Sequence, residues 1–323
     1  MLSSSTPALI LAPMEGVTDA PMRAFQGAAG AFSFAVAEFL RIAYGVPGKP
    51  VFHRHVPELL AGGRTPTGLP VQVQLLGGDA GRLAAAAVVA HQAGATAIDL
   101  NFGCPAPTVN KHDGGATLLK YPHRIREIVS AVRGALPPHV PVSAKLRLGW
   151  DQVEDIFENA AMAAEGGAAW LTIHARTRTQ GYAPPVFWPL VGRVRERLDI
   201  PVVANGDIRT LDDFRRCRDE TGCRHFMLGR GALADPRLAR QVAADLGLIP
   251  AEPDSDLQPD WLVEVQRMRA WTSGHEAERP DRAVLRLKQW LRMAAEFGTF
   301  AWFDAVKRAR SPDEVYAILQ AAA

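Results

Sequence analysis

The chain has 323 residues, of which 48% are hydrophobic, and a formal net charge of +2. This length allows a large core, and the near-neutral charge excludes a polybasic tail protein, so any nucleic-acid contact has to be local. The odd number of cysteines argues against a disulfide framework, and the lack of a basic leader or of roughly 20 consecutive apolar residues predicts a cytoplasmic protein without a membrane span.

Short apolar runs rich in Val, Ile, Leu or Phe recur along the first 231 residues. Most segments between them look helical; residues 210–222, for example, have a threonine cap and a glycine stop. This alternation predicts a parallel sheet covered by helices, and eight units fit a (β/α)8 TIM barrel better than the alternative, an open doubly wound sheet. The predicted strands are residues 9–14, 34–39, 71–77, 97–103, 141–149, 170–176, 201–207 and 225–231.

The pattern changes after residue 248. Three prolines and four acidic residues in residues 249–260 indicate a linker, and no strand pattern returns beyond it. We therefore predict a catalytic barrel over 1–248, a linker over 249–259 and a small helical domain over 260–323. Within that domain, the helices are expected at residues 260–275, 280–297, 299–309 and 312–322.

Polar residues stand at the ends of most predicted strands, which is where barrel enzymes carry their chemistry. Each could be explained singly by packing, but burying so many without partners would cost free energy, so the set indicates a ligand site. These residues are Glu15, Gln74, Asn101, Cys104, Lys145, Arg147, His174, Arg176, Asn205, Asp207 and Arg230.

The last two strands are each followed by a glycine-containing loop, Asn205-Gly206-Asp207 and Gly229-Arg230-Gly231. Barrels commonly hold a phosphate after strands seven and eight, where glycines let backbone N–H groups approach an anion. Ordinary tight turns are the alternative, but the position of both loops favours a phosphate site.

Lys145 lies in the middle of the fifth predicted strand and has three interpretations. It could be a Schiff-base nucleophile, a buried ion-pair partner, or a fixed positive charge over a bound ring that becomes anionic. The nearby strands carry His174 and Gln74, which would give a ring several hydrogen-bond partners. The third interpretation is therefore favoured, with a reduced flavin as the ring.

Cys104 follows a strand end in a loop stiffened by Gly103 and Pro105. A thiol is mostly protonated at neutral pH, so it can donate a proton, whereas a nucleophilic thiolate would need a histidine base. The only histidine nearby in sequence is His112, in a loop expected to be exposed. We therefore favour a proton donor over a nucleophile. His53 and His55 lack a third ligand, and no metal site is predicted.

The C-terminal region is basic: residues 279–310 hold eight Lys or Arg and three Asp or Glu. On a helical wheel, Arg286 and Lys288 lie on opposite sides of an apolar stripe. The charges could form a solvated helix face or a footprint for a phosphate backbone, and they do not distinguish the two.

Seven motifs occur in order: APMEGVTD, VQLLG, LNFGCP followed by GG, KLRLGW, HARTRTQGY, ANGDI and GRGAL. Over nearly its whole length the chain resembles the tRNA-dihydrouridine synthases, and most closely their bacterial C-type. The resemblance implies FMN, reduced by NADPH or NADH, and reduction of the C5=C6 bond of a D-loop uridine, position 16 in the C-type. At position 293, where that type has a tyrosine, this chain has Met293.

The resemblance also implies roles for individual residues. Cys104 gives a proton to C5 and Asn101 holds the uracil, with Arg147 and Arg176 as further substrate contacts. The C-type pattern of tRNA contacts matches Arg41, Arg286, Lys288 and Lys307. The residues implied to contact FMN are Pro13, Met14, Glu15, Gln74, Lys145, His174, Asn205, Gly206, Asp207, Gly229 and Arg230.

Other functions remain open at this point. The main alternative is a barrel like the dihydroorotate or dihydropyrimidine dehydrogenases, which also use FMN but act on free pyrimidines and need no basic helical domain. A Schiff-base aldolase acting through Lys145 and a non-catalytic tRNA-binding protein are further alternatives. For the chain itself, we expect a monomer without a protein partner.

Overall fold

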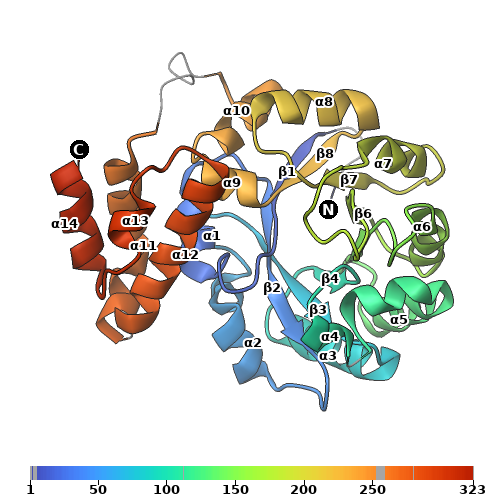
Figure 1. Cartoon of the computed structure of the whole chain (residues 1–323). Coiled ribbons are helices and arrows are strands. Elements are labelled where there is room, and N and C mark those ends of the chain that lie inside the picture. The colour runs from blue at the N-terminus through green and yellow to red at the C-terminus, as the bar shows by residue number, and fades with distance from the viewer. Residues whose placement is uncertain (1, 3–5, 112, 252–258, 279, 323) are drawn as a thin grey trace.

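The computed structural model describes residues 2, 6–111, 113–251, 259–278 and 280–322. Within them, eight parallel strands pair in chain order, and the last pairs with the first to close a barrel (Figure 1). The strands are β1 (Ala8–Leu11), β2 (Phe34–Arg41), β3 (Val71–Leu76), β4 (Ile98–Asn101), β5 (Val142–Arg147), β6 (Leu171–His174), β7 (Val202–Asn205) and β8 (His225–Leu228).

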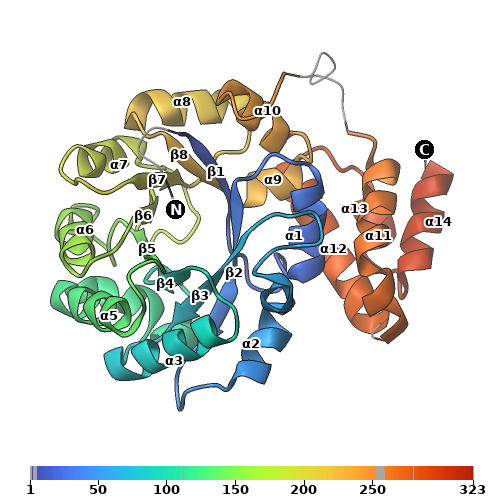
Figure 2. The same cartoon turned by 180° about the vertical axis from the view of Figure 1, so that it is seen from behind.

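Helices connect the strands and cover the outside of the barrel (Figures 1 and 2). In the barrel they are α1 (Ala20–Ala28), α2 (Lys49–His55), η1 (Pro57–Ala61), α3 (Ala80–Gln92), α4 (Pro107–Asn110), η2 (Gly115–Lys120), α5 (Pro122–Ala135), α6 (Asp155–Glu165), α7 (Trp188–Arg195), α8 (Leu211–Thr221), α9 (Arg230–Ala234) and α10 (Leu238–Asp245). Beyond the barrel follow α11 (Trp261–Glu278), α12 (Pro280–Phe297), α13 (Phe303–Val306) and α14 (Pro312–Ala322).

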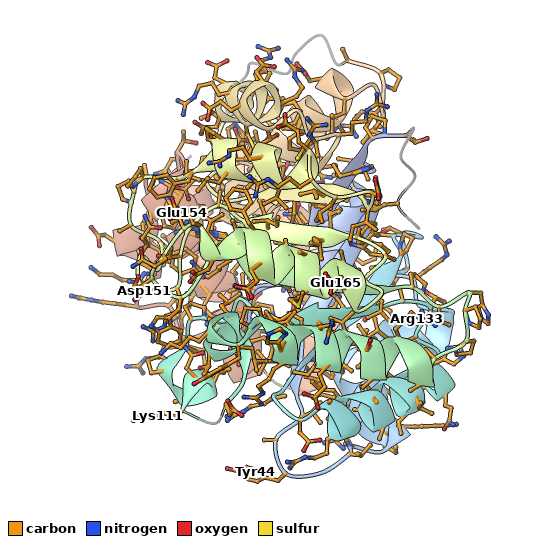
Figure 3. All side chains as sticks on the ribbon, turned by 90° about the vertical axis from the view of Figure 1, so that its right-hand side faces the viewer. Tyr44, Lys111, Arg133, Asp151, Glu154 and Glu165 are labelled. Carbon is orange, nitrogen blue, oxygen red and sulfur yellow. The ribbon has the colours of Figure 1, made fainter. Side chains whose placement is uncertain are left out.

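The barrel helices form where the sequence signals them. Helix α8 begins with a capping box between Thr210 and Asp213 and ends at Gly222, which adopts the left-handed conformation that glycine favours. Helix α5 buries Ile125, Val129 and Val132, so its apolar stripe faces the strands. The outer surface of α5 and α6 is covered with polar side chains such as the exposed Glu165 (Figure 3).

The strand register brings the predicted site residues together. Asn101 on β4 is the register partner of Lys145 on β5, and His174 on β6 pairs with both Arg147 on β5 and Asn205 on β7. Because all strands run parallel, the polar residues at their C-terminal ends lie around one opening.

The C-terminal helices form a bundle that shares its core with two barrel helices. Trp290 on α12 is fully buried, its ring centroid lies 5.1 Å from that of Phe25 on α1, and its Nε1 donates to the Leu233 carbonyl on α9 at 2.9 Å. Figures 1 and 2 show α11–α14 on the side of the barrel where α1 and α9 lie. Apolar burial of this kind fixes the bundle against the side of the barrel.

The barrel prediction is confirmed, and the open doubly wound sheet is wrong. The helix expected at residues 299–309 is shorter than predicted: only Phe303–Val306 is helical. Residues 252–258 of the predicted linker lie outside the described residues. Among the described residues, no helix combines the length and the apolar character needed to cross a membrane.

Candidate active site

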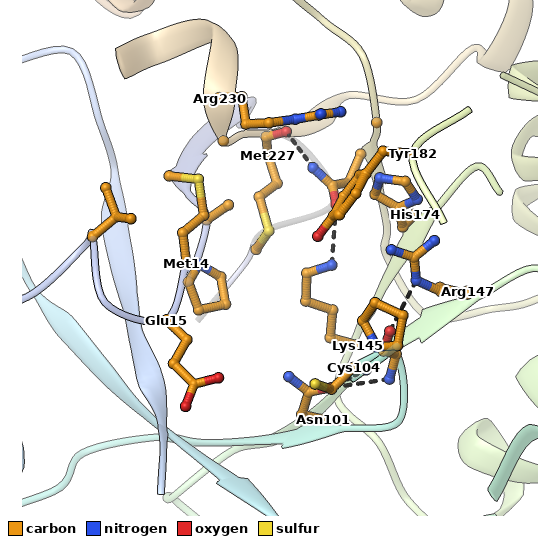
Figure 4. Close-up of a pocket in the computed structure, with 18 of the residues that line it drawn as sticks. Met14, Glu15, Asn101, Cys104, Lys145, Arg147, His174, Tyr182, Met227 and Arg230 are labelled. Carbon is orange, nitrogen blue, oxygen red and sulfur yellow. Dashed lines mark hydrogen bonds between the residues drawn. The ribbon is translucent and has the colours of Figure 1, made fainter. Parts of the chain in front are cut away.

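A cavity of about 540 Å³ opens at the C-terminal ends of the strands. Most of the predicted site residues line it. Met14 and Glu15 lie on one side, Cys104 and Asn101 lie across from Glu15, and Lys145 extends on the side of Cys104 towards Tyr182 (Figure 4). The predicted residues in its lining are Pro13, Met14, Glu15, Asn101, Cys104, Lys145, Arg147, His174, Asn205, Gly206, Asp207, Gly229 and Arg230.

The loop after β4 holds Cys104 in a fixed position. Asn101 Oδ1 accepts hydrogen bonds from the backbone N–H groups of Gly103 and Cys104, each at 2.9 Å. From the other side, the Cys104 carbonyl accepts from Ala116 N at 3.1 Å. Gly115 has a φ of +60°, and a Cβ there would lie 3.0 Å from the Cys104 oxygen. The second residue of the double glycine, Gly115, is therefore needed for the close packing of this loop.

Cys104 is partly exposed, unlike the buried Cys217 and Cys223. Burial raises the pKa of its thiol, and the charge of Glu15 acts in the same direction, while Arg147 and Lys145 oppose them. The thiol therefore stays protonated at neutral pH. His112, the candidate base, lies outside the described residues. A protonated thiol suits proton donation better than nucleophilic attack.

Lys145 lies at the floor of the cavity, where its Nζ donates to Asn205 Oδ1 at 3.1 Å. Desolvation and the charge of Arg147 lower the pKa of Lys145 to about 8. Beside it, the buried His174 has a pKa well below its ordinary value because of burial and the surrounding cations, so the imidazole is neutral. His174 Nδ1 has no hydrogen-bond partner among the described residues. A buried polar atom in this state is available to a ligand.

Arginines gather around Asp207 at the end of β7. The Asp207 carboxylate accepts from Arg230 at 2.9 Å and from Arg209 at 3.3 Å, and it also pairs with Arg176. Burial acts to raise the pKa of Asp207, but its arginine neighbours hold it below the ordinary value. With three arginines on one carboxylate, the cluster keeps net positive charge. The loops after β7 and β8 can therefore hold a phosphate.

Helix α12 supports this cluster from the bundle. The guanidinium carbons of Arg209 and Arg230 lie 4.8 and 4.7 Å from the ring centroid of Phe297. Met293, one turn earlier on α12, lines the cavity itself. The bundle thus contributes residues to the site. The role of Phe297 was not predicted from the sequence.

Tyr182 is a further cavity residue that sequence reasoning missed. The residue is 53% exposed at the cavity rim. Its ring centroid lies 4.3 Å from the Arg230 guanidinium carbon, and the ring contacts His174 edge-on at 6.1 Å between centroids. An aromatic residue closing the HARTRTQGY motif was the available signal. Its exposed face can stack on a flat ligand.

Three predicted residues are held by bonds within the protein. Gln74 is fully buried and does not line the cavity; its amide bonds to Asn101 and Asp99. Arg176 is 1% exposed and reaches the cavity only through Asp207. Arg147 lines the cavity, but its guanidinium donates to the carbonyls of Gly103, Thr177 and Gly181. A direct substrate contact by Arg176 therefore does not fit this arrangement.

The residues predicted to contact tRNA each have a local partner. Arg41 donates to the Thr108 carbonyl at 3.3 Å, and Arg286 pairs with Asp19 of the barrel. Lys288 Nζ donates to the carbonyls of Lys307 and Ala309, and Lys307 Nζ lies 2.6 Å from Asp304. These partners place Arg41 and Arg286 beside the barrel mouth and Lys288 at the end of α13.

The site fits a flavin mononucleotide. A volume of about 540 Å³ lies within the range of cofactor pockets, roughly 300–1,000 Å³. One end offers arginines for a phosphate, and the floor offers Lys145 and the unpartnered nitrogen of His174 for a polar ring. Fold and site together define a barrel enzyme with a protonated thiol beside an anion-binding cavity.

Comparisons with known proteins narrow this class. Residues 10–322 match the family model described as Dihydrouridine synthase (Dus). The "tRNA-dihydrouridine(16) synthase" of Neisseria meningitidis serogroup B is 43% identical over 315 residues, which cover 96% of this chain and 93% of that protein. The protein of the same name from Pseudomonas putida is 44% identical, with 88% and 87% covered. The chain belongs to the dihydrouridine synthase family, and the resemblance found in its motifs is confirmed.

Among solved structures, histamine dehydrogenase from Rhizobium sp. 4-9 is similar, with a TM-score of 0.56, 13% identity, and coverage of 82% of this chain and 49% of that one. At this identity the likeness concerns the barrel fold alone.

Proposed function

We propose that this protein reduces the C5=C6 bond of uridine 16 in the D-loop of tRNA, using FMN that NADPH or NADH has reduced. The family supports a dihydrouridine synthase, and relatives such as the Neisseria meningitidis protein carry the name of the position-16 enzyme over nearly the whole chain. The observation that carries the proposal is the partly exposed Cys104 thiol on the wall of a cavity that fits a flavin.

In this proposal, the loops after β7 and β8 bind the FMN phosphate through Arg230, which Asp207 and Phe297 hold in place. Lys145 and His174 face the polar edge of the ring from the cavity floor. Bound and reduced, FMN supplies a hydride for C6 of the uracil. Lys145 would stabilise the negative charge that the reduced ring carries at this edge before the hydride leaves, because a cation held in a desolvated site needs no reorganisation.

Cys104 acts as the general acid. Its S–H bond breaks as a C–H bond forms at C5, and the resulting thiolate regains a proton from solvent before the next turnover. Asn101 orients the uracil beside it, and Tyr182 stacks on a base or ribose at the rim. The uridine has to leave its stack in the tRNA to reach the cavity, so the protein holds an extruded nucleotide.

The alternative, a dehydrogenase of free pyrimidines, needs no α11–α14 bundle. Here the bundle supplies Met293 to the cavity and places Arg286 beside the mouth. A cation of the bundle beside the cavity can contact parts of a substrate that extend out of it, which favours a polymeric substrate over a free base.

The test uses protein reconstituted with FMN and an unmodified tRNA transcript in the presence of NADPH, then of NADH. Mass spectrometry should find dihydrouridine at position 16, and a transcript with cytidine at that position should remain unreduced. Turnover of free uracil or dihydroorotate, without reduction of tRNA, would favour the dehydrogenase. Dihydrouridine at another position would refute the assignment to uridine 16 but not the reduction of tRNA.

The proposal also includes a cytoplasmic monomer that acts without a protein partner. Size-exclusion chromatography with light scattering should give a mass near 34.9 kDa.

A further inference from the structure

Asp99 is a buried carboxylate inside the barrel that the proposed chemistry does not use. It lies on β4 two residues before Asn101, is 2% exposed and does not line the cavity. Its two oxygens accept hydrogen bonds from Ser143 Oγ at 2.5 Å and Gln74 Nε2 at 2.7 Å. A carboxylate buried this deeply costs free energy, so a role beyond packing has to explain it.

The hydrogen bonds continue from Asp99 to the Cys104 loop. Gln74 donates through Nε2 to Asp99 and accepts through Oε1 from Asn101 Nδ2 at 2.8 Å. Asn101 in turn accepts through Oδ1 from the N–H groups of Gly103 and Cys104. Two side-chain amides thus link a carboxylate inside the barrel to the backbone of the loop.

The direction of this chain is fixed at both ends. A backbone N–H can only donate, so Asn101 has to present its oxygen to the loop and its nitrogen to Gln74. At the other end, burial raises the pKa of Asp99, while the hydrogen bonds from Ser143 and Gln74 and the charge of Lys145 favour its ionised form. In that form the carboxylate can only accept, so Gln74 presents its nitrogen to Asp99 and its oxygen to Asn101. If Asp99 offered no acceptor, Gln74 could turn over, and Asn101 would lose the partner that fixes its own orientation.

We infer that Asp99 is a positioning residue that fixes the Cys104 loop through Gln74 and Asn101. The claim that Asp99 fixes the loop holds whatever reaction the protein catalyses. Only the effect of this positioning on proton donation by Cys104 rests on the proposed function. Gln74, predicted to contact FMN directly, acts in this inference as the middle link beneath Asn101.

A competing explanation is that Asp99 is kept for its charge, which lies near the Lys145 ammonium group. The two explanations make different predictions for Asp99→Asn. The asparagine retains an oxygen for Gln74, and its nitrogen can donate to Ser143 Oγ, so the hydrogen-bond chain survives while the charge is lost. Asp99→Leu removes both.

The experiment measures amide hydrogen exchange of Gly103 and Cys104 in the full-length protein with FMN bound. In Asp99→Leu, exchange of both amides should become about tenfold faster, because each hydrogen bond contributes on the order of one such factor. In Asp99→Asn it should stay within about threefold of the wild type. Ser143→Ala, which leaves the Gln74 contact in place, should also stay near the wild-type rate.

Alkylation of Cys104 by iodoacetamide provides a second readout, with the buried Cys217 and Cys223 as internal controls. Its rate should change in Asp99→Leu and return toward the wild-type value in Asp99→Asn. If Asp99→Leu does not fold, Gln74→Met removes the middle link and should accelerate exchange in the same way.

Unchanged exchange in Asp99→Leu or in Gln74→Met would overturn the inference. Equal acceleration in Asp99→Asn and Asp99→Leu would assign the residue to charge instead. Neither result bears on whether Cys104 donates the proton, which the activity of Cys104→Ala decides separately.

Discussion

The barrel mouth and the helices α11–α14 both carry basic side chains but hold them differently. At the mouth, Lys145 and Arg230 come from β5 and α9 and face one cavity. On the bundle, Lys288 and Lys307 are bound by their own surroundings, a pair of carbonyls and Asp304. The comparison teaches that the barrel topology brings side chains from parallel strand ends to one place. Charged side chains on a helix surface instead bind the polar groups that happen to lie beside them.

The two regions also differ in what a positive charge costs. Lys145 is desolvated, and its pKa of about 8 records the cost of keeping it charged. The Lys307–Asp304 pair is mostly solvent-exposed, and exposed pairs of this kind contribute little to stability. A charge that is kept in a desolvated site at a cost in free energy indicates a function at the mouth. The charges on the bundle become functional only if tRNA replaces their present partners.

The largest effect is expected at the mouth. Cys104→Ala should slow uridine reduction by roughly 100-fold or more, because it removes the general acid. The absorbance of bound flavin should stay unchanged, since the thiol holds no part of the proposed phosphate site. Cys223→Ala is the control and should retain activity; a normal rate in Cys104→Ala would remove this residue from the mechanism.

Two lysine substitutions sharpen the comparison of stability. The folded protein holds the Lys145 proton more weakly than the unfolded chain does. Burying the charged lysine therefore lowers the free energy of unfolding by its full amount below pH 8. This loss of stability disappears as the pH rises from about 8 toward 10.5. At pH 7, Lys145→Met should therefore raise the free energy of unfolding by up to about 3 kcal/mol. This gain should shrink at pH 10.

Lys288→Met should act in the opposite direction. It removes hydrogen bonds to the carbonyls of Lys307 and Ala309, so a loss of about 1 kcal/mol is expected. Urea unfolding of both variants without added flavin measures the difference. If the two lysines shifted stability in the same direction at pH 7, the contrast between the regions would fail.

Arg230→Leu tests the phosphate end of the cavity. Loss of a charge-assisted hydrogen bond should weaken FMN binding about 10- to 100-fold, measured by flavin fluorescence titration. Arg286→Leu is the matched change on the bundle and should leave FMN affinity within about twofold. Equal losses in both variants would indicate general destabilisation instead of a phosphate site.

The smallest effect is expected on the bundle. Changing Arg286 and Lys288 together to glutamine should weaken tRNA binding by about three- to tenfold and reduce the dependence of log K on log salt by about one per lost phosphate contact. Arg197→Gln, on an exposed site beyond α7, serves as control. Identical affinity and salt dependence in the double variant would place the tRNA on another surface.

Residues at strand ends were predictable because strand polarity and register do not depend on detailed packing. Asn101, Cys104, Lys145 and His174 all reach the cavity as expected. Tyr182 and Phe297 were missed because one lies in a long loop and the other on a helix of the bundle, and neither position follows from the barrel pattern.

The buried positions mark the other limit of prediction. Gln74 lies within β3 and Arg176 lies just beyond β6, and they bond to Asp99 and Asp207 within the protein. Alternation along a strand does not decide whether a polar side chain faces a ligand or another side chain in the same layer.

The sequence by itself determined the barrel and the thiol, because apolar periodicity and strand-end chemistry are local properties of the chain, and its ordered motifs determined the family. Only the tertiary structure decided which polar groups meet. The chain from Asp99 through Gln74 to Asn101 joins β3 and β4, and the arginines around Asp207 join three segments to a phenylalanine of the bundle. Such partners are set by the three-dimensional packing of distant segments, which no local pattern encodes.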